Sequence, residues 1–192
     1  MSIAYVWKII PKATPTIEII CTRCHNNRFI CSEKFRINSN KKLSDVWLIY
    51  KCSYCENTWK MNILTRKNLS NMDKHLFHGF QENNRDLAWH YAFTKSIAKC
   101  NKVILNNHVD FEIIEQGNYL HSTEDLLSIL ITSEYELSIT IKKVLQQKLN
   151  LSANEIARLH QEDVFMNKDL SKKIGLGCKL LMNVKKLRNI MK

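Results

Sequence analysis

Two Cys-x-x-Cys pairs constrain this chain more than any other feature of its sequence. The first spans residues 21–24 and the second spans residues 52–55, with 27 residues between them. Two thiolates in one tight turn can bind one side of a small ion, and a second turn completes a tetrahedron. Four thiolates fill the coordination shell, so the predicted metal is structural and not catalytic. We therefore predict one structural zinc ion bound by Cys21, Cys24, Cys52 and Cys55.

Other interpretations of these cysteines remain open. Two disulfides would suit a secreted chain, but the sequence begins without the basic segment of a signal peptide, which predicts a cytoplasmic protein. A redox Cys-x-x-Cys normally occurs singly. His25 and Cys31 lie close enough in sequence to replace one ligand, whereas Cys100 and Cys178 are expected to be inert buried thiols.

The residues around the pairs predict strands. Residues 58–63 alternate apolar and polar side chains, and residues 46–50 form a short apolar run. Further strands are expected at 5–10 and 16–20, and a hairpin is expected from 28–31 and 35–37 around Ser32, Glu33 and Lys34. We predict a zinc-ribbon-like β module over residues 1–66.

Residues 67–135 predict a helical and mixed connecting region. One helix is expected over 73–80, and Asn84 can cap a second helix. Residues 109–114 alternate as a strand does, and the apolar run 126–132 favours a strand over a helix. His75 and His78 could share one helix face, but two histidines without a third ligand are weak evidence for a metal site.

Residues 138–183 carry a second signal. Ser138 can cap a helix, and Ser152 with Glu155 forms the pattern of a capping box at the start of another. A short strand over 164–166 and a last strand over 175–181 are expected to follow.

This stretch resembles the αL RNA-binding motif of a small-subunit ribosomal protein, pseudouridine synthases and heat-shock ribosome-binding proteins. The matching positions are Ser152, Leu159, Val164, Met166, Asn167 and Gly177. Ala153, Glu162 and Lys168 depart from the arginine and the two glycines of the pattern. The resemblance implies an αL-like RNA-binding module over residues 136–192. The basic side chains that would contact RNA are Lys142, Lys143, Lys148, Arg158, His160, Lys172, Lys173 and Lys179.

Charge supports a polyanionic partner. The chain carries 29 Lys/Arg and 18 Asp/Glu, a formal charge of +11, arranged as two basic blocks around an acidic one at 103–141. In the alternative interpretation these blocks pair with one another inside the fold. Within the β module, RNA contacts are expected from Arg23, Arg28, Lys41, Lys42 and Lys51.

The chain as a whole also resembles an uncharacterised bacterial family, domain of unknown function 1062. The resemblance rests on residues 7–12, Cys24, residues 45–52 and Trp59, and it implies no established activity. We find no internal repeat, no membrane-spanning stretch, no Gly-rich phosphate loop and no nucleophile elbow in the sequence.

The sequence therefore predicts an α+β protein with an N-terminal zinc-ribbon-like module, a helical middle and a C-terminal αL-like module. Its expected function is non-catalytic binding of structured ribosomal or transfer RNA, with structural Zn²⁺. The alternative is a protein-interaction or DNA-binding regulator that uses the zinc ribbon for docking.

Overall fold

The computed structural model describes residues 5–40, 43–68, 72–117, 124–167 and 169–190. The fold is α+β, as predicted, and it divides into two compact units. The cysteine unit comprises Ala13 to Val109, and the terminal unit combines the N-terminal strand up to Lys12 with the residues from Asp110 onward. Among the described residues, no helix has the length and apolar character needed to cross a membrane.

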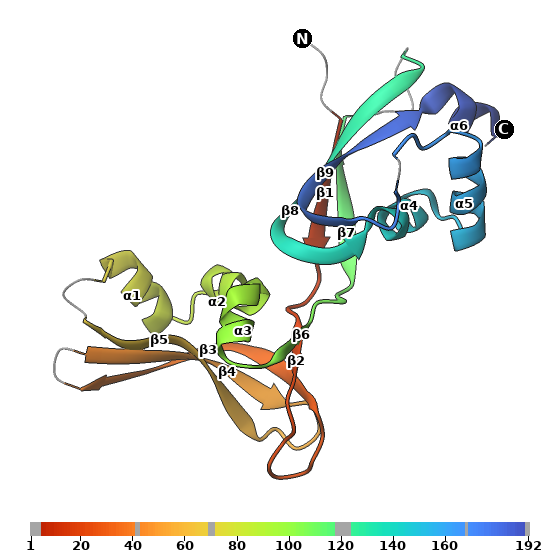
Figure 1. The fold of residues 1–192 in the computed structure, drawn as a ribbon. Coiled ribbons are helices and arrows are strands. Elements are labelled where there is room, and N and C mark those ends of the chain that lie inside the picture. The colour runs from red at the N-terminus through yellow and green to blue at the C-terminus, as the bar shows by residue number, and fades with distance from the viewer. Residues whose placement is uncertain (1–4, 41–42, 69–71, 118–123, 168, 191–192) are drawn as a thin grey trace. The chain divides into compact units, whose positions relative to one another are not determined.

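The cysteine unit is built on a five-stranded antiparallel sheet. Its strand order is β5 (Thr58–Asn68), β4 (Leu43–Cys52), β3 (Arg28–Asn40), β2 (Thr16–Glu18) and β6 (Ile104–Asn106). Alternation along β4 buries Val46, Leu48 and Tyr50 completely, because every second side chain points to the same face. Helices α1 (Lys74–Gln81), α2 (Arg85–Phe93) and α3 (Lys95–Cys100) cover this inner face (Figure 1).

A polar cap begins α2, and aromatic packing joins the helices to the sheet. Asn84 caps α2 as predicted, since its side chain accepts a hydrogen bond from the Leu87 amide. Phe35 on β3 packs edge-on against Phe80 of α1, with ring centroids 4.9 Å apart. Residues 72–109 therefore share one core with the strands and are not a separate connecting region.

The predicted hairpin around residues 32–34 is wrong, because β3 runs through this segment as one strand with a bulge. Glu33 takes a left-handed conformation with φ 57°, and the register shifts between Cys31 and Lys34. Helix α2 holds the bulge in place: the Glu33 carboxylate accepts a hydrogen bond from Trp89 Nε1 at 2.6 Å and pairs with Arg85 at 3.4 Å. Glu33, one of the polar residues that suggest a turn, is thus used in tertiary contacts.

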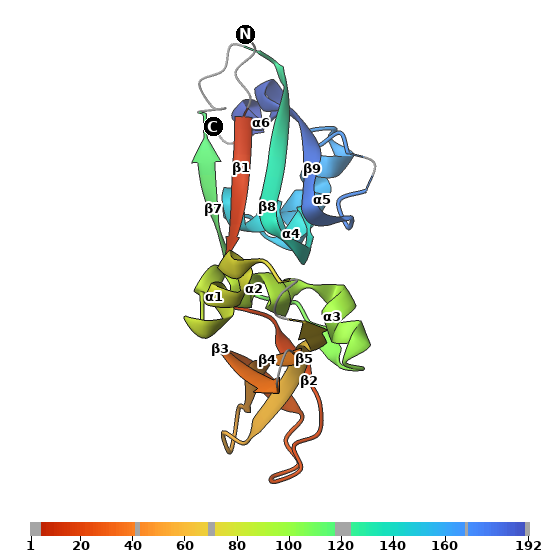
Figure 2. The ribbon, with the colours of Figure 1, turned by 90° about the vertical axis from the view of Figure 1, so that its left-hand side faces the viewer.

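The terminal unit contains a four-stranded sheet in the order β7 (Phe111–Gln116), β1 (Tyr5–Pro11), β8 (Leu126–Thr140) and β9 (Lys173–Asn183), shown in Figure 2. Strands β1 and β8 are parallel, and the other neighbours are antiparallel. Helices α4 (Ile141–Leu149) and α5 (Ala153–Gln161) cover one face, and α6 (Val184–Ile190) follows β9. The strands predicted at 109–114 and 126–132 are present as β7 and β8.

The N-terminal strand is the main departure from the predicted organisation. β1 lies inside the terminal sheet, with Trp7 and Ile9 buried, and it does not join the cysteine-bearing strands. The Lys12 amide donates to the Asp110 carbonyl at 2.8 Å, so the chain leaves and re-enters this unit at adjacent points. The two units accordingly differ from the predicted segments 1–66, 67–135 and 136–192, and β8 runs across the last of those boundaries.

Local details of residues 138–183 follow the sequence with two adjustments. The capping box of Ser152 and Glu155 is present at α5. The cap of α4 is Thr140 and not Ser138, because β8 continues to Thr140. The short strand at 164–166 is reduced to a single bridge between Phe165 and Met182.

Gly177 of β9 pairs with Thr132 of β8. A Cβ atom at this position would sit 2.8 Å from the Ile131 carbonyl oxygen, which is backbone and cannot rotate away. We therefore expect Gly177→Ala to destabilise the protein by about 1–3 kcal/mol in urea unfolding. The neighbouring Leu176 is 62% exposed, so Leu176→Ala is the matched control and should change stability by less than about 0.5 kcal/mol. Equal stability of the two variants would contradict this account of the glycine.

Candidate metal centre

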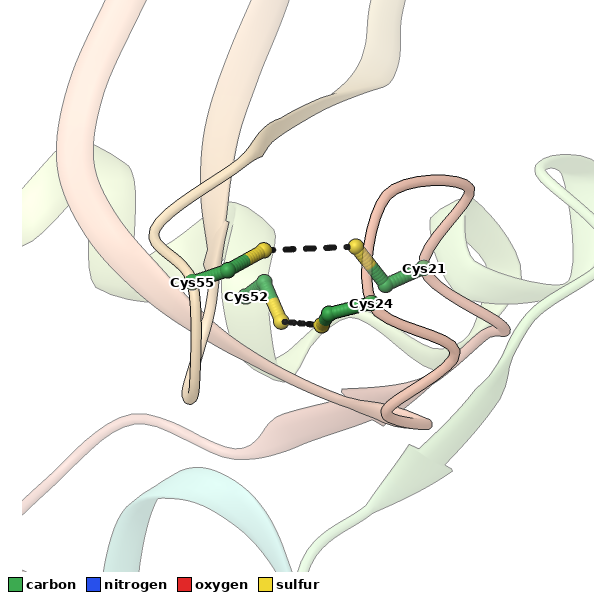
Figure 3. A group of neighbouring side chains, drawn as sticks. All are labelled: Cys21, Cys24, Cys52 and Cys55. Atoms are coloured by element: carbon green, nitrogen blue, oxygen red, sulfur yellow. Dashed lines mark hydrogen bonds between the residues drawn. The ribbon is translucent and has the colours of Figure 1, made fainter.

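Two turns that are distant in sequence bring four sulfur atoms together. Figure 3 shows the sulfur atoms of Cys21 and Cys24 facing those of Cys55 and Cys52, with Sγ–Sγ distances of 3.6 Å and 3.5 Å. All four Sγ atoms lie within 4.8 Å of one another. Zn–S bonds of about 2.3 Å in a tetrahedron require sulfurs about 3.8 Å apart. The donor set therefore fits the predicted ion, and the spacing is too long for the alternative of disulfides, which need about 2.05 Å.

The two turns have the same backbone structure. In the first, the Cys21 carbonyl accepts from the His25 amide at 2.9 Å, and in the second the Cys52 carbonyl accepts from the Glu56 amide at 3.1 Å. His25 and Glu56 both adopt the left-handed conformation, with φ 60° and 58°. Each turn thus ends one residue after its second cysteine. Its two sulfur atoms face those of the other turn (Figure 3).

Each turn contains one asparagine whose side chain contacts a cysteine sulfur of the other turn. Asn26 Nδ2 lies 3.5 Å from Cys52 Sγ and donates to Ser53 Oγ at 2.8 Å, while Asn57 Nδ2 lies 3.7 Å from Cys21 Sγ. These residues were not predicted, but the sequence holds a signal for them. The pattern Cys-x-x-Cys-x-Asn occurs at 21–26 and again at 52–57, so the expectation of no internal repeat overlooked this short one.

Hydrogen bonds lower the pKa of one thiol of the cluster, whereas burial and neighbouring sulfurs raise the pKa of another. Burial alone would raise the pKa of Cys52, but the amides of Cys55 and Tyr54 and the Asn26 side chain donate to its sulfur and lower its pKa to about 6. The Asn26 amide would lower the pKa of Cys24, yet burial and the neighbouring sulfurs raise it to about 12. Four thiolates this close repel one another, and a divalent cation supplies the charge that allows all four to ionise.

The alternative ligands do not join the cluster. Cys31 is buried in the core of the cysteine unit, where its sulfur accepts from the Glu33 amide at 3.4 Å and burial raises its pKa to about 11. His25 is exposed at the turn, and His78 pairs with Glu82 at 3.1 Å. Within the described ranges, the four cysteines form the one group of three or more potential ligands. The prediction that Cys100 and Cys178 are buried is wrong, since Cys100 is exposed and Cys178 half-buried.

Three of the eight side chains predicted to contact RNA interact instead with other residues of the terminal unit. Lys148 forms an ion pair with Glu115 and lies 5.7 Å from the ring centroid of Trp7. Arg158 pairs with Glu162 at 2.9 Å. His160 Nε2 lies 2.7 Å from the Asn167 carbonyl oxygen and joins the end of α5 to the following loop.

The other five predicted RNA contacts belong to two places on the terminal unit. Backbone hydrogen bonds from Ile141 to Lys172 and from Lys142 to Leu170 hold the start of α4 beside the start of β9. This junction brings together Lys142, Lys143, Lys172 and Lys173. Lys179 lies further along β9, opposite Leu130. In the cysteine unit Arg23, Arg28 and Lys51 are exposed, and Lys41 and Lys42 lie outside the described residues.

Most of the net charge lies in the cysteine unit. Residues 13–109 contain 15 Lys/Arg and 7 Asp/Glu, a formal +8, whereas the terminal unit contains 14 and 11, a formal +3. The acidic segment and the basic C-terminal block belong to the same unit, where Lys185 also pairs with Asp125 at 3.3 Å. The alternative of internal pairing therefore describes part of the terminal unit, and the larger net positive charge belongs to the cysteine unit.

Comparison with known proteins identifies one family. A family model described as "Protein of unknown function (DUF1062)" matches residues 37–170, which is more than half of the chain. No curated protein matches the chain, and no solved structure matches it.

Zinc content tests the ligand set. We expect the purified protein to hold one zinc ion per chain and Cys55→Ala to lose it, because three thiolates leave the shell open. Loss of the ion should also reduce the ordered structure of the cysteine unit in circular dichroism, since metal binding and folding are coupled in such sites. Cys100→Ala removes an exposed thiol outside the cluster and serves as the control. A Cys55→Ala variant with a full equivalent of tightly bound zinc would refute the assignment.

Metal affinity tests the asparagine links. Asn26→Ala and Asn57→Ala should each weaken zinc binding by about 10- to 100-fold, because each removes an N–H donor from a ligand sulfur. Titration against a chelator of known affinity measures the change. Asn27→Ala is the matched control, since Asn27 is exposed in the same turn. The asparagines have no such role if all three variants bind zinc equally well.

Proposed function

The chain belongs to the DUF1062 family of proteins of unknown function, and we propose that it is a non-catalytic, zinc-stabilised RNA-binding protein. The observation that carries the proposal is the convergence of four thiols within 4.8 Å in the more basic of the two units. A closed four-sulfur shell gives zinc no open position for substrate or water, so its role is to fix the two turns and the strands that lead into them. Thiol ligands require reducing conditions, which favours the cytoplasm.

Charge is the argument for a nucleic-acid partner. A formal +8 on a unit of 97 residues attracts phosphates over distances of about a Debye length, and Lys and Arg side chains then hold the backbone without reading its sequence. In the terminal unit, the lysines at the start of α4 and β9 could add a second contact. The order of α4, the capped α5 and β9 is compatible with the αL resemblance, which supports structured ribosomal or transfer RNA as the ligand.

A protein-docking function is the second candidate. Tyr54 is 80% exposed within the second turn, and Ile20 is 69% exposed just before the first. Apolar side chains so close to a rigid metal centre are suitable anchors for a partner protein. A pull-down from nuclease-treated lysate separates the candidates, because protein partners retained without RNA would favour docking.

Salt dependence tests RNA binding. We expect zinc-loaded protein to bind a labelled transfer RNA in fluorescence anisotropy, with log Kd rising linearly with log salt concentration and a slope of about 3 or more. Such a slope corresponds to about four neutralised phosphates. Chelation should weaken binding, whereas the chelated-then-reloaded protein is the control and should recover. Affinity that does not change between low and moderate salt would contradict the proposal.

A further inference from the structure

The outer face of the cysteine unit's sheet, opposite the helices, combines an aromatic ring with several cations. Residues of β3, β4 and β5 that point away from the core form this surface, which we call the Trp47 face. It includes Lys34, Arg36, Asp45, Trp47, Ile49, Lys51 and Lys60.

Strand register places these side chains next to one another. Arg36 pairs directly with Trp47, and Ile49 pairs with Lys34 on one side and Lys60 on the other. Directly opposed residues of an antiparallel pair share a face, with Cβ atoms about 4.5–5.5 Å apart, and diagonal neighbours lie about 7–8 Å apart. Trp47 is therefore surrounded by the cations of three neighbouring positions. Lys51 continues the same row along β4 and immediately precedes the ligand Cys52.

The charge of the Trp47 face is not neutralised by the rest of the fold. Lys34, Arg36, Lys51 and Lys60 form no ion pair within the part of the chain that the structure describes. The one carboxylate that β4 adds to this face is that of Asp45, and it accepts a hydrogen bond from the Arg66 amide at 2.8 Å. The face therefore carries four cations and one carboxylate, which already accepts a hydrogen bond, and this excess of positive charge favours an anionic ligand.

The ring of Trp47 is available to a flat partner. Trp47 is half-buried, and the Lys60 ammonium lies 5.2 Å from its ring centroid. An exposed cation–π contact contributes about 0.5–1 kcal/mol, whereas a nucleic-acid base stacked on an aromatic ring contributes about 1–3 kcal/mol. A base can therefore displace the ammonium, which is then free to contact the adjacent phosphate.

From these contacts, and resting on the RNA-binding function proposed above, we propose that the Trp47 face binds single-stranded RNA. An unpaired base stacks on Trp47, and Lys34, Arg36, Lys51 and Lys60 contact the flanking phosphates. An unpaired strand fits better than a duplex, because bases inside a duplex do not offer their faces and a broad sheet cannot enter the deep groove of A-form RNA. The zinc centre fixes the end of β4 and thereby the position of Lys51.

The test uses the zinc-loaded full-length chain and a fluorescein-labelled, unstructured 12-nucleotide RNA at constant salt. Trp47→Ala should weaken binding roughly 5- to 100-fold, and Trp47→Phe should retain most of the affinity because it keeps a ring. Lys34→Gln with Lys60→Gln should lower the salt slope by about 1.4, at about 0.7 per phosphate contact. Lys74→Gln with Lys99→Gln removes the same charge from exposed positions on α1 and α3 of the same unit and should leave this slope unchanged. Zinc content and thermal unfolding confirm that each variant is folded.

The outcomes separate this inference from the function on which it rests. If the native chain binds the RNA and Trp47→Ala binds it equally well, the Trp47 face is refuted while RNA binding stands. If Lys142→Gln with Lys143→Gln causes the loss instead, the terminal unit carries the contact. A native chain that binds neither this RNA nor transfer RNA refutes both proposals. Tighter binding to the same sequence as a duplex than as a single strand would also overturn the assignment of an unpaired strand.

Discussion

The approach of two cysteine turns across 27 residues of intervening chain is the contact on which the cysteine unit depends. Cys21 and Cys52 are buried with Ile17, Phe29 and Tyr50, so the sulfurs belong to the hydrophobic core as well as to the candidate metal site. Sheet, helices and candidate metal site therefore stabilise one another, and a change at the sulfurs should lower the stability of the whole unit. In a small β-rich unit of this kind, a bound metal can supply folding stability that a larger hydrophobic core would otherwise provide.

Sequence reasoning succeeded where the physics is local. Cysteine spacing within a turn, the caps Asn84 and Ser152, and the alternation along β4 and β5 are each decided within a few residues, and the structure bears them out. The four cysteines also converge as predicted, although their two turns are distant in sequence, because each turn supplies its own half of a cluster that could hold a metal ion.

The failures concern contacts between distant segments. The sequence of residues 5–10 predicts a strand but not its partners, and β1 pairs with residues 100 or more positions away. The segment 32–34 has the composition of a turn, yet Trp89 and Arg85 of α2 hold it as a bulge. Counting charge along the chain likewise missed that the acidic segment and the C-terminal lysines belong to one unit, which leaves the cysteine unit as the basic one.

The cysteine unit interrupts the terminal unit between Lys12 and Asp110, and this has a consequence for biosynthesis. β1 is translated before β7 and β8, its two neighbours in the sheet, and at about 5–20 residues per second the delay is on the order of 5 to 25 seconds. During that interval Trp7 and Ile9 have no sheet to enter, and at its end the intervening unit has its complete sequence while β8 and β9 are still to be translated. The cysteine unit can therefore fold first. The sheet of the terminal unit forms later, when β7, β8 and β9 become available to pair around β1.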